Sequence, residues 1–433
     1  MSGDLLIRGG HVVDPANGLD GPADILVRDG KIAGVGKNLK SGAGTVIDAK
    51  GLTVTPGLID LQVHMREPGR EDRETIETAS RAALAGGVTS VVAMPNTTPV
   101  ADNQTVIEFV LKRAREVDLV NVYPTGAITR GQQGSMLAEI NELKKSGAVA
   151  VTDDGVDVQD ENILRRALEY TKTCDILLMS HCETESLTAG GVMHEGWVST
   201  QLGLPGTSAA SEDLAVVKNI LLANLCGARL HLLHNSSEGA IAAIRATKKS
   251  ERRNVTAEVS VQHFALSDEE CLGYNTNAKM YPPLRSAEHI AAVIAGIKDD
   301  TVDAFTTDHA PHIEPDKLEP FVHAAFGSTG LETSFAVMHS YLVRAGHISL
   351  AKGISKMTVE PAKILRIEKG TLSVGADADI AIFDTKKSWV VDARESFSKG
   401  KNCVFDGKKL TGKAEYTIVG GRVKFAGGSI VGN

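Results

Sequence analysis

The stretch DLQVHMREPG, residues 60–69, contains the residues around which the rest of the chain is organised. It continues an apolar, β-rich run over residues 52–61 that predicts a strand, and it ends in a Pro-Gly pair typical of a turn. His64 and Arg66 are two residues apart, so their side chains lie on one face of an extended strand. The pair therefore predicts that a histidine able to bind a metal and an arginine able to bind an anion face the same cavity. A histidine near a surface arginine is common in proteins, so this pair alone is weak evidence for a functional site. It becomes informative because polar side chains also follow the other expected strands.

The middle of the chain, residues 53–368, alternates apolar strand-like runs with helical stretches. Eight strands are expected within residues 57–64, 88–96, 119–126, 147–155, 175–181, 228–234, 254–260 and 302–309. Such alternation over about 300 residues predicts an α/β fold of the (β/α)8 TIM-barrel type. A doubly wound open sheet is the alternative. It would usually carry a glycine-rich phosphate loop after its first strand, and the sequence contains neither GxGxxG nor GxxxxGK[ST].

Both ends of the chain consist of short β-like runs separated by glycine turns. Asp29-Gly30 and Gly420-Gly421 each lie between two such runs and predict hairpin turns. We therefore expect residues 1–52 and 369–433 to form one small β-sandwich domain, and residues 53–368 to form the barrel.

The composition restricts the classes of partner. The 433 residues have a formal net charge of −8 and no basic block, which argues against nucleic acid and against an anionic membrane surface. A small anionic substrate would need a local basic pocket. The N-terminal residues do not resemble a signal peptide, and no apolar run reaches membrane-spanning length. The five cysteines are scattered without a CxxC pair, which predicts a reducing, cytoplasmic location.

Polar side chains follow the expected strands where each strand ends, and these ends meet at the catalytic face of a barrel. The residues are His64, Arg66, Asn96, Asp154, His181, His234, Asp308 and His312. Any single histidine could be a buried core residue, but the set together favours a site. Imidazole and carboxylate ligands are typical of catalytic zinc, which activates water for hydrolysis. A carboxylate at the last strand, Asp308, could then transfer the proton. No GxSxG nucleophile motif competes, since residues 327–330 read GSTG.

Several segments together resemble one family, the bacterial-type dihydroorotases of the cyclic amidase branch of the amidohydrolase superfamily. The segments are DLQVHMREPG, VVAMPNTTP, AVTDDG, MSHCE, LHLLHNSS, TNAKMYPPLR, TTDHAPH and GTLSVGADADIAIFD, and they span nearly the whole chain. The resemblance implies reversible cyclisation of N-carbamoyl-L-aspartate to L-dihydroorotate and water in pyrimidine biosynthesis. It also implies one or two Zn²⁺ ions per subunit.

Site roles follow from the resemblance residue by residue. His64 would bind zinc, Asp154 would bridge two metal positions, His181 and His234 would hold the second metal, and Asp308 would be both ligand and general acid/base. The substrate would be held by Arg66, Asn96, Asn277, His312 and the backbone of Phe326 and Gly327. An aspartate at position 154, where related cyclic amidases carry a carboxylated lysine, favours dihydroorotase over dihydropyrimidinase or hydantoinase.

The chain departs from the family pattern at Gln62, which replaces the first histidine of the HxH motif. Tyr281 and Gln262 are further departures, at positions that bind no metal. A glutamine amide should bind zinc less well than imidazole. Three hypotheses therefore remain: an active enzyme with one metal position weakened, a weak or inactive subunit that scaffolds aspartate carbamoyltransferase, and an allantoinase- or hydantoinase-type cyclic amidase. The oligomeric state stays open, with a homodimer as the commonest closed assembly.

Overall fold

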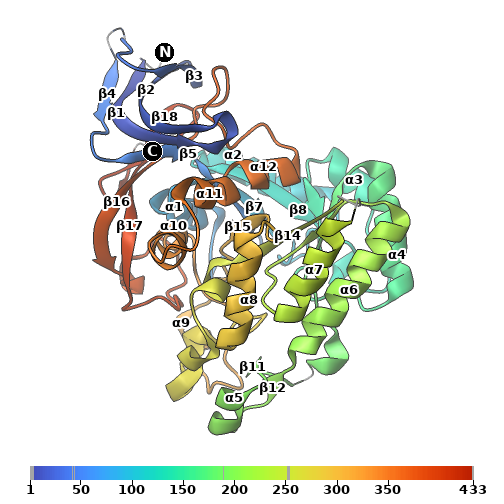
Figure 1. Ribbon diagram of the computed structural model, residues 1–433. Helices are drawn as coiled ribbons and strands as arrows, with labels where there is room; N and C mark the ends of the chain where they lie inside the picture. Colours follow the sequence, from blue (N-terminus) through green and yellow to red (C-terminus); the bar gives the residue numbers. More distant parts are fainter. Residues whose placement is uncertain (1–3, 41, 43, 189, 251–253, 432–433) are drawn as a thin grey trace.

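A computed structural model describes residues 4–431 apart from 41, 43, 189 and 251–253 (Figure 1). Its centre is an eight-stranded sheet in the order β15-β14-β13-β10-β9-β8-β7-β6, and every neighbouring pair is parallel. The strands are β6 (Leu58–Val63), β7 (Val88–Ala93), β8 (Asn121–Gly126), β9 (Ala150–Val151), β10 (Leu177–Ser180), β13 (Leu230–Leu232), β14 (Val255–Ser260) and β15 (Ala304–Thr306). The backbone N–H of His64, just after β6, donates to the carbonyl oxygen of His309, just after β15, at 2.9 Å. This contact between the two outermost strands of the sheet nearly closes the barrel. The expected barrel is confirmed.

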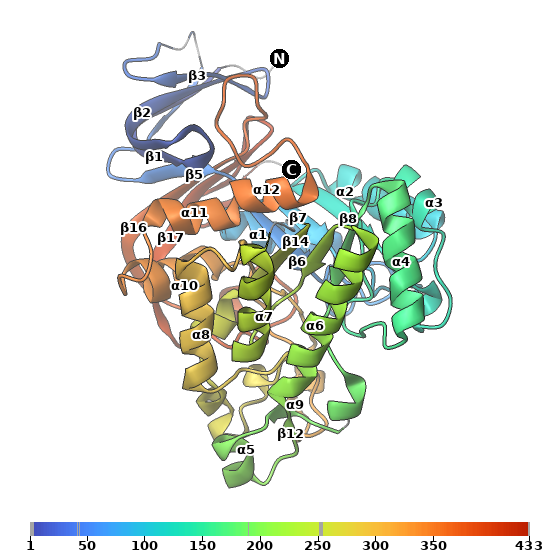
Figure 2. The same cartoon turned by 45° about the vertical axis from the view of Figure 1, so that its right-hand side comes forward.

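Helices surround the barrel, as Figures 1 and 2 show. Those that follow barrel strands are α1 (Ile76–Ala85), α2 (Gln104–Val117), α3 (Ile140–Lys145), α4 (Glu161–Cys174), α6 (Ala209–Cys226), α7 (Glu238–Lys249) and α8 (Ala287–Lys298). Most begin at a side chain that caps the first free backbone N–H groups, for example Asp160 before α4 and Ser237 before α7. Shorter helices are α5 (Trp197–Leu202), α9 (Glu314–Leu318) and α10 (Ser334–Met338), and α11 (Leu350–Met357) and α12 (Val359–Leu365) lead towards the C-terminal strands.

The two ends of the chain form one nine-stranded sheet. It contains β1 (Leu5–Asp14), β2 (Leu19–Arg28), β3 (Lys31–Gly36), β4 (Thr45–Asp48), β5 (Thr53–Pro56), β16 (Ile380–Val390), β17 (Lys409–Val419), β18 (Arg422–Ala426) and β19 (Ser429–Ile430). β5 pairs with β1 on one side and β16 on the other, so the expected domain boundary at residue 52 moves to the end of β5. The hairpin turns meet, because a Cβ on Gly421 would lie 2.8 Å from Gly30 Cα.

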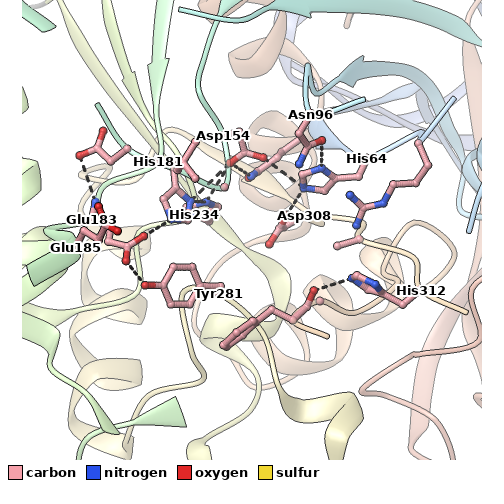
Figure 3. A pocket seen from close by; sticks show the side chains of 18 of the residues that line it. His64, Asn96, Asp154, His181, Glu183, Glu185, His234, Tyr281, Asp308 and His312 are labelled. Atoms are coloured by element: carbon pink, nitrogen blue, oxygen red, sulfur yellow. Dashed lines mark hydrogen bonds and ion pairs between the residues drawn. The ribbon is translucent and has the colours of Figure 1, made fainter. Parts of the chain in front are cut away.

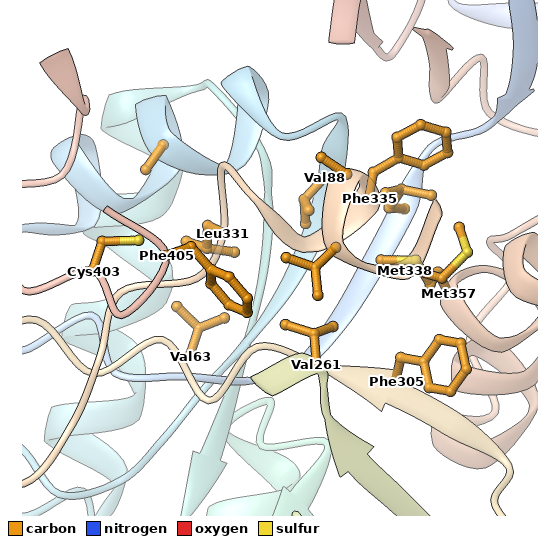
Figure 4. Close-up of a cluster of buried hydrophobic side chains, with 14 of the residues drawn as sticks. Val63, Val88, Val261, Phe305, Leu331, Phe335, Met338, Met357, Cys403 and Phe405 are labelled. Carbon is orange, nitrogen blue, oxygen red and sulfur yellow. The ribbon is translucent and has the colours of Figure 1, made fainter. Parts of the chain in front are cut away.

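A continuous apolar core joins the small β-domain to the barrel (Figure 4). Phe335 of α10 stacks on Phe383 of β16 with ring centroids 3.7 Å apart, and Val88 of β7 and Phe305 of β15 belong to the same cluster. This shared core fixes the β-domain against the barrel. Over the described residues, none of the helices combines the length and apolar character needed to span a membrane.

Candidate active site

A cavity of about 530 Å³ lies at the carboxyl ends of the barrel strands. The expected site residues that line it are Gln62, His64, Arg66, Asn96, Asp154, His181, His234, Asp308, His312, Phe326 and Gly327. In Figure 3, Asp154 lies between the His181–His234 pair on one side and His64 on the other. Residues from six different strand ends thus converge, because the ends of parallel barrel strands share one face.

Asp154, His181 and His234 form a buried group whose ligand atoms all lie within 4.8 Å of one another. Asp154 Oδ1 is 3.6 Å from His181 Nδ1 and 3.6 Å from His234 Nε2. The other ring nitrogen of His181 lies 3.3 Å from Glu183 Oε2, so Nδ1 is the atom that faces the group. Two imidazoles and a carboxylate, oriented in this way by an outer carboxylate, are a donor set that suits zinc.

His64 faces the other oxygen of Asp154. His64 Nε2 is 3.3 Å from Asp154 Oδ2 and 3.2 Å from Asp308 Oδ1. Its Nδ1 lies 2.9 Å from Asn96 Oδ1, which fixes the ring so that Nε2 points into the cavity. Asn96 was expected to contact substrate, and the structure adds a contact that orients His64. Asp154 therefore presents one oxygen to each of two ligand groups.

Gln62 is fully buried beside this carboxylate. Its Nε2 donates to Asp154 Oδ1 at 2.9 Å, while its Oε1 is buried and has no hydrogen-bond partner within the part of the chain that the structure describes. The amide nitrogen, and not a potential ligand oxygen, thus faces Asp154. In this orientation Gln62 holds the carboxylate in place.

The electrostatics of the group suit a cation. Burial raises the pKa of Asp154, but hydrogen bonds to His181 and His234 outweigh burial and hold that pKa well below its usual range. Burial likewise lowers the pKa of His181, but Asp154 and Glu183 outweigh it and raise the pKa to about 10. An ionised buried carboxylate that favours positive charge around it is the environment a divalent metal would occupy.

Arg66, the residue expected to bind an anionic substrate, lines the cavity beside the predicted metal ligands. Arg66 keeps its charge at neutral pH, although burial and the nearby Arg73 lower its pKa to about 10. Burial and the charge of Arg66 lower the pKa of His312 to about 2, so this imidazole is neutral. His312 Nε2 donates to Phe326 O at 2.7 Å, which connects the pocket to the loop that carries Phe326.

That loop is held by a buried lysine, Lys317, which no sequence motif indicated. Lys317 Nζ donates to Ala325 O at 2.7 Å and to Gly327 O at 3.0 Å. Gly327 itself has φ +134°, and a Cβ there would lie 2.7 Å from the Ala310 side chain, so the close approach requires glycine. Asn277 lies in the short helix η6 (Thr276–Ala278), and its contact with substrate stays a prediction.

Glu183 and Tyr281 were also not assigned a role. The Tyr281 hydroxyl donates to Glu183 Oε1, and its ring stacks on His181 with centroids 5.5 Å apart. Both residues line the cavity and hold His181 in position. The signal available in the sequence was the spacing of Glu183, two residues after a candidate ligand.

Comparisons with known proteins agree with this geometry. The family described as "Dihydro-orotase-like" matches residues 51–240, and the family described as "Amidohydrolase family" matches residues 237–425. A dihydroorotase of Syntrophus aciditrophicus is 48% identical over 97% of this chain and 99% of its own length. One from Pelotomaculum thermopropionicum is 50% identical over 97% of this chain and 98% of its own. The chain belongs to the dihydroorotase family.

Solved structures of other cyclic amidases share the fold of this dihydroorotase-family chain. An L-hydantoinase (dihydropyrimidinase) from Arthrobacter aurescens superposes with a TM-score of 0.89 at 27% identity, covering 99% of this chain and 97% of its own. A dihydropyrimidinase from Brevibacillus agri gives a TM-score of 0.84 at 21% identity, over 99% and 96% of the two chains. The expected amidohydrolase fold is thereby confirmed.

Proposed function

We propose that this chain is a metal-dependent dihydroorotase, which interconverts N-carbamoyl-L-aspartate with L-dihydroorotate and water in pyrimidine biosynthesis. The observation that carries the proposal is the position of Asp154, which presents one oxygen to His64 and the other to the His181–His234 pair. Arg66 lines the same cavity and supplies the charge that an anionic substrate needs. The names of the relatives at 48–50% identity agree with this activity.

The residues of the cavity fit a metal of the zinc type. Asp154, His181 and His234 would hold one Zn²⁺, and His64 with Asp308 would contribute to a second position. A bound metal would lower the pKa of the reacting water and polarise the ring carbonyl. In the ring-opening direction, Asp308 takes the proton of the attacking water and transfers it to the leaving ring nitrogen. Arg66 and the neutral His312 orient the substrate carboxylate and ring, so that one carbonyl faces Asp308.

Gln62 decides how many metal ions we expect. Its amide nitrogen donates to Asp154 Oδ1 at 2.9 Å, so the position beside His64 keeps His64, Asp308 and one oxygen of Asp154. We infer tight binding at the His181–His234 position and weak binding at the His64 position. Elemental analysis after dialysis measures the ratio, and Gln62→His should raise the bound zinc per subunit towards two.

The test of the activity is a ring-opening assay on zinc-reconstituted protein, with Gln62→His beside the wild type. Turnover by the wild type would support the proposal. A silent wild type rescued by Gln62→His would favour the second candidate, a weak or inactive subunit that scaffolds aspartate carbamoyltransferase, for which Gln62 is the supporting observation. Ring opening of hydantoin or allantoin, but not of dihydroorotate, would instead assign the chain to the other cyclic amidases.

A cytoplasmic location is part of the same proposal. All five cysteines are unpaired, and Cys182, Cys271 and Cys403 are buried. Free buried thiols are typical of proteins kept in a reducing compartment.

A further inference from the structure

The connection between β16 and β17 leaves the β-domain and reaches the loops at the carboxyl ends of the barrel strands. We call its residues 398–404 the crossing segment. Cys403 in this segment is buried in the apolar core that joins the two domains, in the same cluster as Val63 and Leu331 (Figure 4). The crossing segment is therefore part of the packed interior and not a free surface loop.

Asn402 lies in the crossing segment and is buried. Its Oδ1 accepts from the backbone N–H of His312 at 2.9 Å. Its Nδ2 donates to Ala310 O and to Gly327 O, both at 3.0 Å, and its backbone carbonyl accepts from the N–H of Thr329 at 3.0 Å. A single asparagine from the β-domain thereby joins the two chain segments of the barrel that carry substrate-binding groups.

Gly400 brings the crossing segment against the residue between these contacts, Pro311. A Cβ at Gly400 would lie 2.6 Å from Pro311 Cβ and 2.8 Å from Pro311 Cα, so the two segments approach this closely because residue 400 has no side chain. Pro311 O in turn accepts from Arg66 Nε at 3.4 Å. The loop that the crossing segment holds thus carries His312 and a hydrogen-bond partner of Arg66.

A second attachment holds the start of the crossing segment through Glu74. The buried Glu74 carboxylate accepts from the hydroxyl of Ser398 and from the backbone N–H of Lys399. Its Oε2 also lies 3.3 Å from His309 Nε2. The other ring nitrogen of His309 accepts from the backbone N–H of Gly330 at 3.2 Å. The crossing segment is therefore attached to the same two barrel segments at its start and again at residue 402.

Asn121 ties the β-domain to the barrel in a comparable way, but at the opposite end of the barrel. It begins β8, and its Nδ2 donates to Thr89 O at 3.0 Å and to Asp379 Oδ2 at 2.9 Å. The site lies at the carboxyl ends of the strands, so Asn121 does not reach it. A substitution at Asn121 therefore reports the effect of a weakened domain contact alone.

We propose that Asn402 is a positioning residue for the ring-opening reaction, which acts by holding His312 and the loop at Gly327 in place. The inference rests on the proposed function, in which Arg66 and His312 orient the substrate. A displaced loop would weaken the contacts with substrate, whereas Asp308 keeps its contact with His64. The expected signature is an increased KM with a smaller change in kcat.

Steady-state ring opening of dihydroorotate by the full-length, zinc-reconstituted protein tests the proposal. Asn402→Leu keeps the approximate size of the side chain and removes its three hydrogen bonds, so KM should rise roughly tenfold. Asn121→Leu is the matched control, which should lower the unfolding temperature and leave KM unchanged. An active wild type whose KM is not altered by Asn402→Leu would overturn the positioning role alone. A wild type without turnover would overturn the proposed function, and this inference with it.

A double-mutant cycle shows whether Asn402 acts through His312. In the His312→Ala background, Asn402→Leu should raise KM much less than it does in the wild type, because the side chain that it positions is absent. The same fold-change in both backgrounds would contradict the proposal, since a general loss of stability affects both alike.

Gly400→Ala disturbs the same loop while Asn402 is kept. Its added methyl group should displace the loop at Pro311 and raise KM, and thermal unfolding checks that the variant folds. A folded Gly400→Ala protein with wild-type KM would count against the proposal, because the loop would then tolerate displacement of the crossing segment.

Discussion

Replacement of Asn96 by leucine should weaken metal binding beside His64. The structure gives the reason: His64 Nδ1 has Asn96 Oδ1 as its partner at 2.9 Å, and His64 is only 6% exposed. Leucine keeps the approximate size of asparagine but removes the acceptor, which leaves a buried N–H without a partner. That loss costs about 1–3 kcal/mol, which corresponds to a zinc affinity roughly 5- to 150-fold weaker.

The assay is competition for zinc with a chelator of known affinity, measured at fixed pH on the wild type, Asn96→Leu and Asn96→Asp. The aspartate variant keeps an acceptor for His64 Nδ1 and should bind zinc within a few-fold of the wild type. Substrate effects are separated by measuring zinc affinity without substrate. Wild-type zinc affinity in Asn96→Leu, with only KM increased, would refute the orienting role and leave Asn96 as a substrate contact alone.

Other consequences follow from single contacts. Arg66→Ala should raise KM at least tenfold with a smaller change in kcat. Asp308→Asn should abolish turnover and retain substrate binding, as measured by calorimetry. An Asp308→Asn enzyme with near-normal kcat would remove this carboxylate from the mechanism. Lys317→Met should raise KM, because the loop that carries Phe326 loses the amino group that donates to its carbonyl oxygens. An unchanged KM would show that other contacts hold this loop. Burial raises the pKa of Glu212, but the charge of Arg285 and hydrogen bonds outweigh it and lower the pKa to about 2, so this carboxylate stabilises the fold above its unfolded pKa. We expect the free energy of unfolding to fall by about 3 kcal/mol as the pH falls from 4.5 towards 2. Urea unfolding across this pH range measures it, and the free energy of unfolding of Arg285→Met should depend less on pH than that of the wild type.

Local patterns were sufficient to predict much of the fold. Strand-like runs that alternate with helical periodicity predicted the eight barrel strands, because burial on both faces of a parallel strand demands a continuous apolar run. The hairpin turns at Gly30 and Gly420 were also predicted, since positive φ angles there favour glycine. The domain boundary was displaced because β5 reads like any other short strand, and only its pairing with β1 and β16 assigns it to the β-domain.

For the candidate site too, some features were predictable from the sequence and others depended on the tertiary structure. The sequence alone determined which residue types stand at the strand ends, and barrel topology brings such ends together. Tertiary structure decided which atoms meet: the amide nitrogen of Gln62 on Asp154, Asn96 on His64, and Lys317 on the loop at Gly327. Sequence periodicity determines the face on which a side chain lies, but a hydrogen bond requires an angle and a distance that depend on how distant segments pack.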